Sequence, residues 1–288
     1  MRSTYDNVTM SDGAPIRTAR FEPDTAPTGV IQFVHGFGEH LGMYERLADY
    51  FIPHGYAFVI HDQRGHGSMP GKTPAQRAKA LGVAEYADFL ADITTLRSRI
   101  DAWYPGLPVV LAGLSMGGNI VANYVERNPA APYDKVIIES PWLRLAKPMP
   151  AVVTAVARLG GKLSPKLAIA SGLDLDAVTR DREETAILKN DPLYHGRISF
   201  RLYTAILDAG EYAIAHAADI ALPTLLLTGT GDRIVSVQAI RELAAKAGPN
   251  LTLKEFDGAY HCLHYETNQA EVRQAMLDFL TGSGVDPA

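Results

Sequence analysis

Hydrophobic residues along the chain form short runs that alternate with longer amphipathic segments. The short runs are rich in aliphatic and β-branched residues and are bounded by turn-forming residues, which is typical of buried strands; they cover residues 29–35, 56–62, 108–113, 135–140, 223–229 and 251–257. Segments with apolar residues three and four positions apart predict helices packed on a sheet; they lie at 43–53, 84–103, 117–128, 236–247 and 267–281. Strands that alternate with helices imply crossover connections and a mainly parallel sheet covered on both faces. The predicted fold class is α/β.

Two parts of the chain depart from this alternation. Residues 5–21 hold two extended stretches around Ser11-Asp12-Gly13, which predicts a hairpin. More than 80 residues separate the strand ending near Ser140 from the next strand, and this gap has helical patterns at 150–159 and 200–217. We therefore predict a core formed by 1–140 and 216–288, with 141–215 inserted as a helical lid. The lid is expected over the carboxyl edge of the sheet, where open α/β sheets bind ligands.

A serine lies where a strand pattern changes into a helix pattern. Residues 108–124 read PVVLAGLSMGGNIVANY, and Ser115 stands between Gly113 and Gly117. A sharp strand-to-helix turn strains the backbone, and glycines two residues before and after the serine remove Cβ atoms that would collide with neighbouring chain. Such a turn exposes the hydroxyl at the positive end of the following helix. Ser115 is therefore our candidate nucleophile.

A serine hydroxyl needs a base to accept its proton and an acid to orient that base. In this kind of sheet the order along the chain is serine, acid, histidine. Asp232 follows the strand at 223–229 through a Gly-containing turn, and we prefer it to its rivals, which are Asp208, Asp219 and Asp257. His261 comes four residues after the strand at 251–257, whereas His264 is already near the last helix. The predicted triad is Ser115, Asp232 and His261.

The tetrahedral oxyanion formed during acyl transfer also needs preorganised hydrogen-bond donors. One expected donor is the backbone N–H of Met116, the residue after the nucleophile. The second should follow the strand at 29–35, where the sequence reads His35-Gly36-Phe37-Gly38. Because glycines flank Phe37 on both sides, we predict that its N–H faces the pocket.

Composition and charge exclude several classes of protein. Of 288 residues, 47% are hydrophobic and 20% charged, the net charge is −5, and no basic block appears, so no nucleic acid partner is expected. The single cysteine, Cys262, excludes an intramolecular disulfide framework.

Residues 1–23 lack the apolar core of a secretory signal, and no window reaches 18 consecutive apolar residues. We expect a cytoplasmic protein. The histidine pairs 35/40, 61/66 and 261/264 do not form H-E-x-x-H and no Cys cluster accompanies them, so no metal is expected.

Six motifs, taken together, resemble those of a known superfamily. They read HGFGEHLGMYERLA, HDQRGHGSMPG, GLSMGG, NDPLYHG, LLLTGTGDRIV and GAYHCLHYE, beginning at residues 35, 61, 113, 190, 225 and 258. In order and spacing they resemble the α/β-hydrolases, and among these the monoacylglycerol lipase and lysophospholipase group. The resemblance covers nearly the whole chain.

The resemblance implies cleavage of monoacylglycerol- or lysophospholipid-like esters through an acyl-enzyme, with the triad and oxyanion donors named above and no cofactor. It also implies a mobile lid above an acyl-chain tunnel. Family members often carry Arg and Tyr in the headgroup pocket where this chain has Met43 and Leu188, while His264 matches a histidine near the alcohol. These three residues are the candidates for substrate binding. Because Met43 and Leu188 are apolar, a preference for free glycerol is not predicted.

Two other classes of function stay open. The same triad serves thioesterases, peptidases and acyltransferases, although a proline-releasing peptidase of this superfamily typically has Trp rather than Met116 after the serine. A third hypothesis is a non-catalytic ligand-binding protein, because a fold alone does not fix function. The expected partner is a small lipid ester, with transient contact to membranes or micelles through the lid. The sequence predicts neither acyl length nor oligomeric state.

Overall fold

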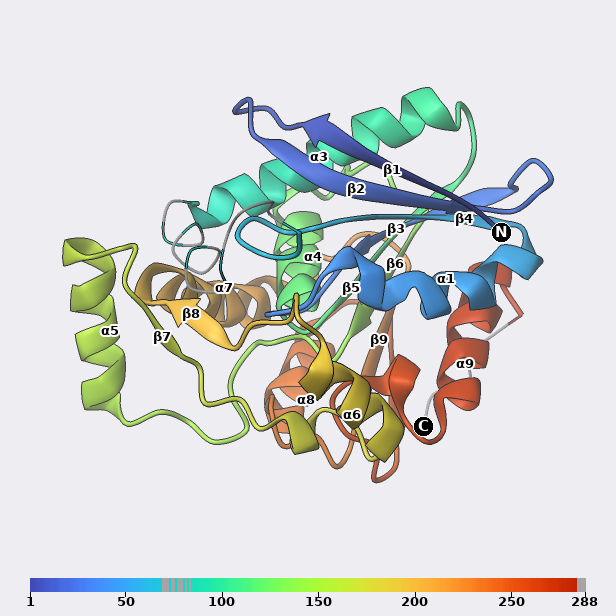
Figure 1. The fold of residues 1–288 in the computed structure, drawn as a ribbon. Helices are drawn as coiled ribbons and strands as arrows, with labels where there is room; N and C mark the ends of the chain where they lie inside the picture. Colours follow the sequence, from blue (N-terminus) through green and yellow to red (C-terminus); the bar gives the residue numbers. More distant parts are fainter. Residues whose placement is uncertain (69–72, 74–75, 77–79, 81, 83, 284–288) are drawn as a thin grey trace.

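The computed structural model describes residues 1–283 except 69–72, 74–75, 77–79, 81 and 83. The end of the second motif, residues 69–71, lies outside the described residues. An eight-stranded sheet forms the centre of the molecule (Figure 1). In spatial order its strands are β1 (Arg2–Thr9), β2 (Pro15–Glu22), β4 (Tyr56–His61), β3 (Gly29–Val34), β5 (Val109–Leu114), β6 (Lys135–Glu139), β9 (Thr224–Gly229) and β10 (Leu251–Phe256).

The sheet is parallel from β4 to β10, while β1 and β2 form an antiparallel hairpin that pairs with β4. The predicted strands and the N-terminal hairpin agree with these elements to within a few residues. Because all the parallel strands run in one direction, the loops that follow them meet at a single edge of the sheet. The predicted α/β class is confirmed.

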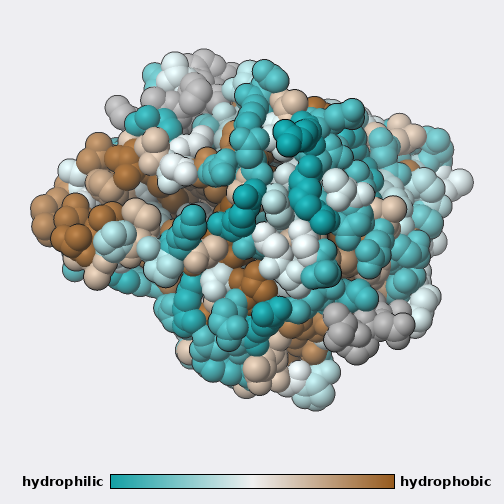
Figure 2. All heavy atoms as spheres, turned by 90° about the horizontal axis from the view of Figure 1, so that it is seen from below, coloured by the Kyte–Doolittle hydropathy of each residue, from teal (hydrophilic) through white to brown (hydrophobic). Residues whose placement is uncertain are grey.

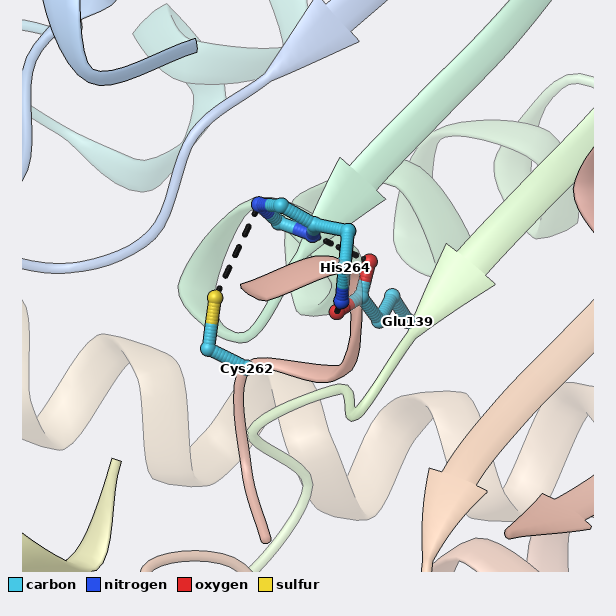
Figure 3. A group of neighbouring side chains, drawn as sticks. All are labelled: Glu139, Cys262 and His264. Atoms are coloured by element: carbon cyan, nitrogen blue, oxygen red, sulfur yellow. Dashed lines mark hydrogen bonds and ion pairs between the residues drawn. The ribbon is translucent and has the colours of Figure 1, made fainter. Parts of the chain in front are cut away.

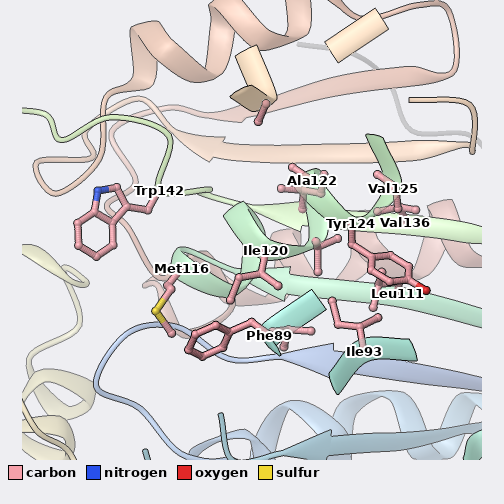
Figure 4. Close-up of a cluster of buried hydrophobic side chains, with 14 of the residues drawn as sticks. Phe89, Ile93, Leu111, Met116, Ile120, Ala122, Tyr124, Val125, Val136 and Trp142 are labelled. Atoms are coloured by element: carbon pink, nitrogen blue, oxygen red, sulfur yellow. The ribbon is translucent and has the colours of Figure 1, made fainter. Parts of the chain in front are cut away.

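Helices cover both faces of the sheet. On one face lie α3 (Tyr86–Trp103), α4 (Met116–Arg127) and α8 (Val237–Lys246), and on the other lie α1 (Glu45–Phe51) and α9 (Gln269–Thr281). Alternate residues of β3 enter the two cores, since Val30 and Val34 pack on the α4 side and Ile31 and Phe33 on the α1 side. Figure 4 shows part of the first core around α3, α4 and β5. Short 3-10 helices follow β3, α1, α7 and β10; they are η1 (Leu41–Tyr44), η2 (Ile52–His54), η4 (Ala217–Asp219) and η5 (Leu263–Tyr265).

The segment between β6 and β9 holds two kinds of structure. Its first part comprises α5 (Ala151–Leu163), β7 (Ala168–Ala170), η3 (Leu175–Ala177), α6 (Arg182–Asn190) and β8 (Arg197–Ser199). Its last element, α7 (Phe200–His216), buries Leu202, Ile206 and Ala213 in the same core as α4 and α8. The predicted lid over 141–215 therefore includes a helix that packs as part of the core layer, and its boundary at 215 falls in the last turn of that helix. Among the described residues, no helix combines the length and the apolar character needed to cross a bilayer.

Candidate active site

Ser115 occupies the turn that joins β5 to α4, in a backbone conformation that few non-glycine residues adopt. Its φ is 57° and its ψ is −115°, which is a strained geometry that the surroundings must hold in place. Its N–H donates to the carbonyl of Glu139 at 2.9 Å. A Cβ on Gly117 would lie 2.0 Å from the carbonyl oxygen of Val34, and a Cβ on Gly113 would lie 2.7 Å from that of Gly117. The two flanking glycines are therefore required for the close approach of three backbone segments.

Asp232 and His261 meet at the same edge of the sheet, although 29 positions separate them in the chain. Asp232 lies in the loop after β9 and His261 in the loop after β10. The Nδ1 atom of His261 is 2.7 Å from Oδ2 of Asp232, and the carboxylate is fully buried. The other oxygen, Oδ1, accepts the N–H groups of Ile234 and Val235 at 2.7 and 3.0 Å. This bonding fixes the carboxylate and leaves Nε2 of His261 as the ring atom available to other groups.

The environment of His261 works in two opposite directions on its pKa. Burial by itself lowers the pKa, because it disfavours the charged imidazolium. The charge of Asp232 and its hydrogen bond to the ring outweigh burial, and the pKa of His261 is raised above its ordinary value of 6.5. Glu39 and Glu139 add to this attraction. The site therefore stabilises a protonated imidazole, which is the state that a general base reaches after it accepts a proton.

The backbone N–H groups of Phe37 and Met116, the predicted oxyanion donors, lie in two segments next to Ser115. Met116 is the first residue of α4, so no carbonyl of its own helix can accept its N–H. Phe37 lies in the turn after β3, and no hydrogen bond from its N–H to another described residue is recorded. A Cβ on Gly36 would lie 3.4 Å from Cβ of Ser115, so the two loops are in contact. This arrangement can hold a developing negative charge beside the serine.

Ser115 and His261 line one cavity of about 490 Å³ together with Gly36 and Phe37. The cavity extends from the sheet edge into the segment that follows β6. Most of its other walls are apolar side chains from that segment, namely Leu145, Met149, Val153, Ala157, Ile169, Val178, Leu188, Ile198, Phe200 and Tyr203. A pocket with a few convergent polar groups at one end and a long apolar wall suits a ligand with a polar reactive group and a hydrocarbon chain.

The family model described as Serine aminopeptidase, S33 matches residues 25–268. The chain belongs to this family. The S33 chain is 34% identical to a monoacylglycerol lipase of Mycolicibacterium smegmatis over 249 residues, which are 86% of each protein. It is 30% identical to the monoglyceride lipase of Homo sapiens over 262 residues, which are 89% of this chain and 82% of that one.

Solved structures agree with these relatives. The crystal structure of Paleococcus ferrophilus monoacylglycerol lipase is 30% identical to the S33 chain, with a TM-score of 0.81 and coverage of 93% of this chain and 99% of that one. The resemblance expected from the motifs is confirmed, and the fold is that of the α/β-hydrolases. The S33 chain is accordingly a serine hydrolase of the carboxylic ester hydrolase class, similar to monoacylglycerol lipases.

The structure brings one of the three predicted substrate-binding residues of the S33 chain to the cavity. Leu188, on α6, lines it. Met43 lies in η1 away from the cavity, where its carbonyl accepts the hydroxyl of Tyr265. His264 is fully buried and bonded elsewhere, so it is not among the cavity-lining residues. Met43 and His264 are therefore not placed to touch a ligand bound in this cavity.

His264 instead belongs to a buried cluster with Glu139 and Cys262 in the S33 chain (Figure 3). Its Nδ1 lies 2.7 Å from Oε2 of Glu139, and its Nε2 lies 3.6 Å from Sγ of Cys262. The other carboxylate oxygen of Glu139 accepts the N–H groups of Leu263 and His264 at 2.7 and 3.2 Å. Burial raises the pKa of the Cys262 thiol well above its ordinary value. One possible ligand atom from each residue lies within 4.8 Å of the others, which would admit a metal ion, but the hydrogen bonds already engage every group. The cluster fastens the loop that carries His261.

Several residues that the sequence did not single out also line the cavity. Trp142, Tyr194 and Arg233 all line the cavity. Arg233 directly follows Asp232, so its position beside the predicted acid was the one available signal. Trp142 and Tyr194 come from the long segment after β6, where no local pattern tells a cavity wall from an ordinary core.

Proposed function

We propose that this enzyme hydrolyses carboxylic esters of lipids through an acyl-enzyme, with Ser115 as nucleophile, His261 as general base and Asp232 as the group that orients it. The proposal rests on one observation: a buried Asp232 carboxylate holds Nδ1 of His261 at 2.7 Å, and this histidine shares a cavity with the strained Ser115. Acyl transfer needs this combination of an exposed hydroxyl, a base and an oriented acid.

In the proposed reaction, Oγ of Ser115 attacks the ester carbonyl while Nε2 of His261 accepts its proton. The negative charge that develops on the carbonyl oxygen is stabilised by the N–H groups of Phe37 and Met116. His261 then donates the proton to the departing alcohol, and an acyl-Ser115 ester is formed. Water, deprotonated by the same imidazole, releases the fatty acid and restores the serine.

The apolar part of the cavity supports an acyl chain as the substrate portion inside the protein. In this proposal the lid comprises the segment from 141 to 199, since α7 packs with the core helices. Val178 accepts the N–H groups of His261 and Cys262 at 3.1 and 2.8 Å, which joins this segment to the loop that carries the base. Movement of the lid would therefore be concentrated in α5 and β7, which lie before this attachment.

The outer face of α5 supports transient contact with a lipid surface. Figure 2 shows hydrophobic side chains gathered at one end of the molecule, where α5 and β7 lie. The exposed large apolar residues there are Met149, Val152, Val153, Val156, Leu159, Leu163, Leu167 and Ile169. A contiguous apolar patch of this kind marks an interaction site more often than a plain surface. We propose that this patch touches membranes or micelles while a lipid ester enters the cavity.

The test is hydrolysis of p-nitrophenyl esters of two, eight and twelve carbons, with a fluorophosphonate probe as an independent label of the nucleophile. Ser115→Ala should lose both hydrolysis and labelling. Ser98→Ala, at an exposed position of α3, is the matched control and should keep both. Retention of full hydrolysis by Ser115→Ala would rule out the mechanism. The same panel should include aminoacyl amides and acyl-CoA. Faster cleavage of the amides than of the esters would indicate a peptidase, and faster cleavage of acyl-CoA would indicate a thioesterase.

A further inference from the structure

Two cations line the mouth of the cavity and come from segments far apart in the chain. Lys147 belongs to the loop after β6, and Arg233 directly follows Asp232. Both side chains are exposed and both residues line the cavity shared by Ser115 and His261. They therefore lie where the wall of the cavity is open to solvent.

A backbone bridge brings the two segments that carry these residues side by side. Leu145 and Val235 form an antiparallel bridge, and the N–H of Ala146 donates to the carbonyl of Ile234 at 2.9 Å. Lys147 and Arg233 each lie two residues from this bridge, in bends rather than in extended strands. Two cations on neighbouring segments repel one another, and an anion bound near both would offset that repulsion.

The structure gives these cations little charge compensation. Arg233 is held over the ring of Tyr260, 4.3 Å from its centroid, and donates to the carbonyl of Asp176 at 3.1 Å. No ion pair between a described carboxylate and either Lys147 or Arg233 is recorded. By contrast, Arg144, in the same loop as Lys147, is paired with Glu211 and Glu242, both at 2.6 Å.

Acidic groups at the cavity do not cancel this charge. Asp174 is the exposed carboxylate among the cavity-lining residues, and its Oδ1 accepts the N–H of Asp176. Glu39 is buried deeper, where it accepts the N–H of Gly36 and the hydroxyl of Tyr44, and burial raises its pKa. The mouth of the cavity therefore carries an excess of positive charge, whereas its interior is apolar.

We infer that Lys147 and Arg233 form a subsite for an anionic headgroup, a phosphate carried by the lipid ester, so that phosphate-bearing lysolipids are preferred to neutral monoacylglycerols. The inference rests on the proposed ester hydrolysis. The acyl chain would lie in the apolar cavity, the ester at Ser115, and the phosphate at the mouth, between an ammonium group and a guanidinium group. Arg presents several N–H donors in a planar array and Lys adds a compact charge, which together suit a phosphate.

The test compares 1-lauroylglycerol with 1-lauroylglycerol 3-phosphate, both below their micellar concentrations. The measured quantity is the ratio of kcat/KM for the phosphate ester to kcat/KM for the neutral ester. A contact between exposed charges changes a binding constant by about 1.4- to 5-fold. The Lys147→Gln/Arg233→Gln double variant removes two such contacts and should lower the ratio by about 2- to 25-fold. High salt should lower the wild-type ratio in the same direction.

A matched control separates a local subsite from the general field of the protein. Lys162→Gln/Lys166→Gln removes the same charge from the lid, and neither lysine lines the cavity; the ratio should stay at the wild-type value. An unchanged ratio in the Lys147/Arg233 variant, or an equal fall in the control, would overturn the inference. If Arg233→Gln does not fold, Lys147→Gln alone should still lower the ratio.

A binding measurement keeps the inference separate from the proposed reaction. Dodecyl phosphate and dodecyl glycerol ether cannot be hydrolysed by acyl transfer, and calorimetry with each measures the headgroup preference without turnover. Tighter binding of dodecyl phosphate, lost in the Lys147→Gln/Arg233→Gln variant, would support the subsite even if both esters prove not to be substrates, a result that would defeat only the proposed function. Equal binding of the two lipids would overturn the inferred phosphate subsite. Binding of inorganic phosphate as tight as that of dodecyl phosphate would overturn it too.

Discussion

Replacing Asp232 with asparagine removes one buried negative charge and leaves the shape of the side chain almost unchanged. An asparagine oxygen can still accept the N–H groups of Ile234 and Val235, as Oδ1 of Asp232 does at 2.7 and 3.0 Å. Its NH₂ group would then face Nδ1 of His261 and donate to it. The ring proton would consequently move to Nε2, and this nitrogen could no longer accept the proton of Ser115. The perturbation therefore acts on the tautomer and charge of the base rather than on packing.

The expected loss can be worked out from these contacts. A charge-assisted hydrogen bond at 2.7 Å between buried partners stabilises the imidazolium formed during the reaction by about 3 kcal/mol, or roughly 100-fold in rate. The wrong tautomer adds roughly another 10- to 100-fold. Asp232→Asn should therefore lower kcat by about 10³- to 10⁴-fold, with little change in the binding of ester.

The pH dependence gives a second, independent readout. His261 must be neutral to act as a base, so kcat/KM rises as the pH passes its pKa, which Asp232 holds above 6.5. Without the carboxylate, burial lowers that pKa, and the rising limb of the residual activity should move to lower pH. The assay is hydrolysis of a p-nitrophenyl ester from pH 5 to 9, with p-nitrophenolate read at a common quench pH.

Asp257→Asn is the matched control, because this aspartate also follows a strand but is exposed and accepts the hydroxyl of Thr230. It should leave both kcat and the position of the limb unchanged. If Asp232→Asn lowers kcat by less than tenfold, or leaves the rising limb of the pH–rate profile at its wild-type pH, the role assigned to the carboxylate is refuted.

Three other changes have defined outcomes. Gly117→Ala should lower the free energy of unfolding by about 2 to 4 kcal/mol in urea titrations, because its Cβ would lie 2.0 Å from the carbonyl oxygen of Val34; Gly248→Ala, with open space around it, should have little effect, and equal losses would contradict this account. Glu126 on α4 is buried without a recorded hydrogen-bond partner among the described residues, and burial raises its pKa to about 9. The unfolded chain releases this proton near pH 4.5, so stability falls as the pH rises from 4.5 to 9; Glu126→Gln should add about 1 to 3 kcal/mol at pH 8 and almost nothing at pH 4, and an equal effect at both would refute burial as the cause. Val156→Asp, on the exposed face of α5, should weaken sedimentation with lipid vesicles, and unchanged sedimentation would remove α5 as the contact.

Local sequence pattern was enough to predict much of the fold. The strands around Ser115 are buried on both faces, so they read as continuous apolar runs, and the glycines at 113 and 117 are needed wherever three backbone segments come this close. Because the strands are parallel, the loops that carry Ser115, Asp232 and His261 lie at one edge of the sheet. This conclusion needs no measured distance between the three residues. The α/β class and the positions of these residues after their strands therefore follow from short-range pattern.

Chain order already favoured Asp232 and His261 over similar residues, but the contacts of these residues came from the tertiary structure. Asp232 and Asp257 both follow strands, yet it is Asp232 that lies 2.7 Å from His261, while Asp257 bonds to Thr230. His261 and His264 are three positions apart, but one lines the cavity and the other is buried against Glu139.

The long segment after β6 was the least predictable from sequence. Its amphipathic helices have the same apolar periodicity whether they pack on the core, as α7 does, or form a cavity wall with an exposed outer face, as α5 does. The meeting of Lys147 and Arg233 likewise depends on a bridge between distant segments. Which segments form strands and helices follows from the local sequence, because each segment's preference is local. Which distant side chains come into contact follows from the packing of the whole chain, and no local pattern encodes it.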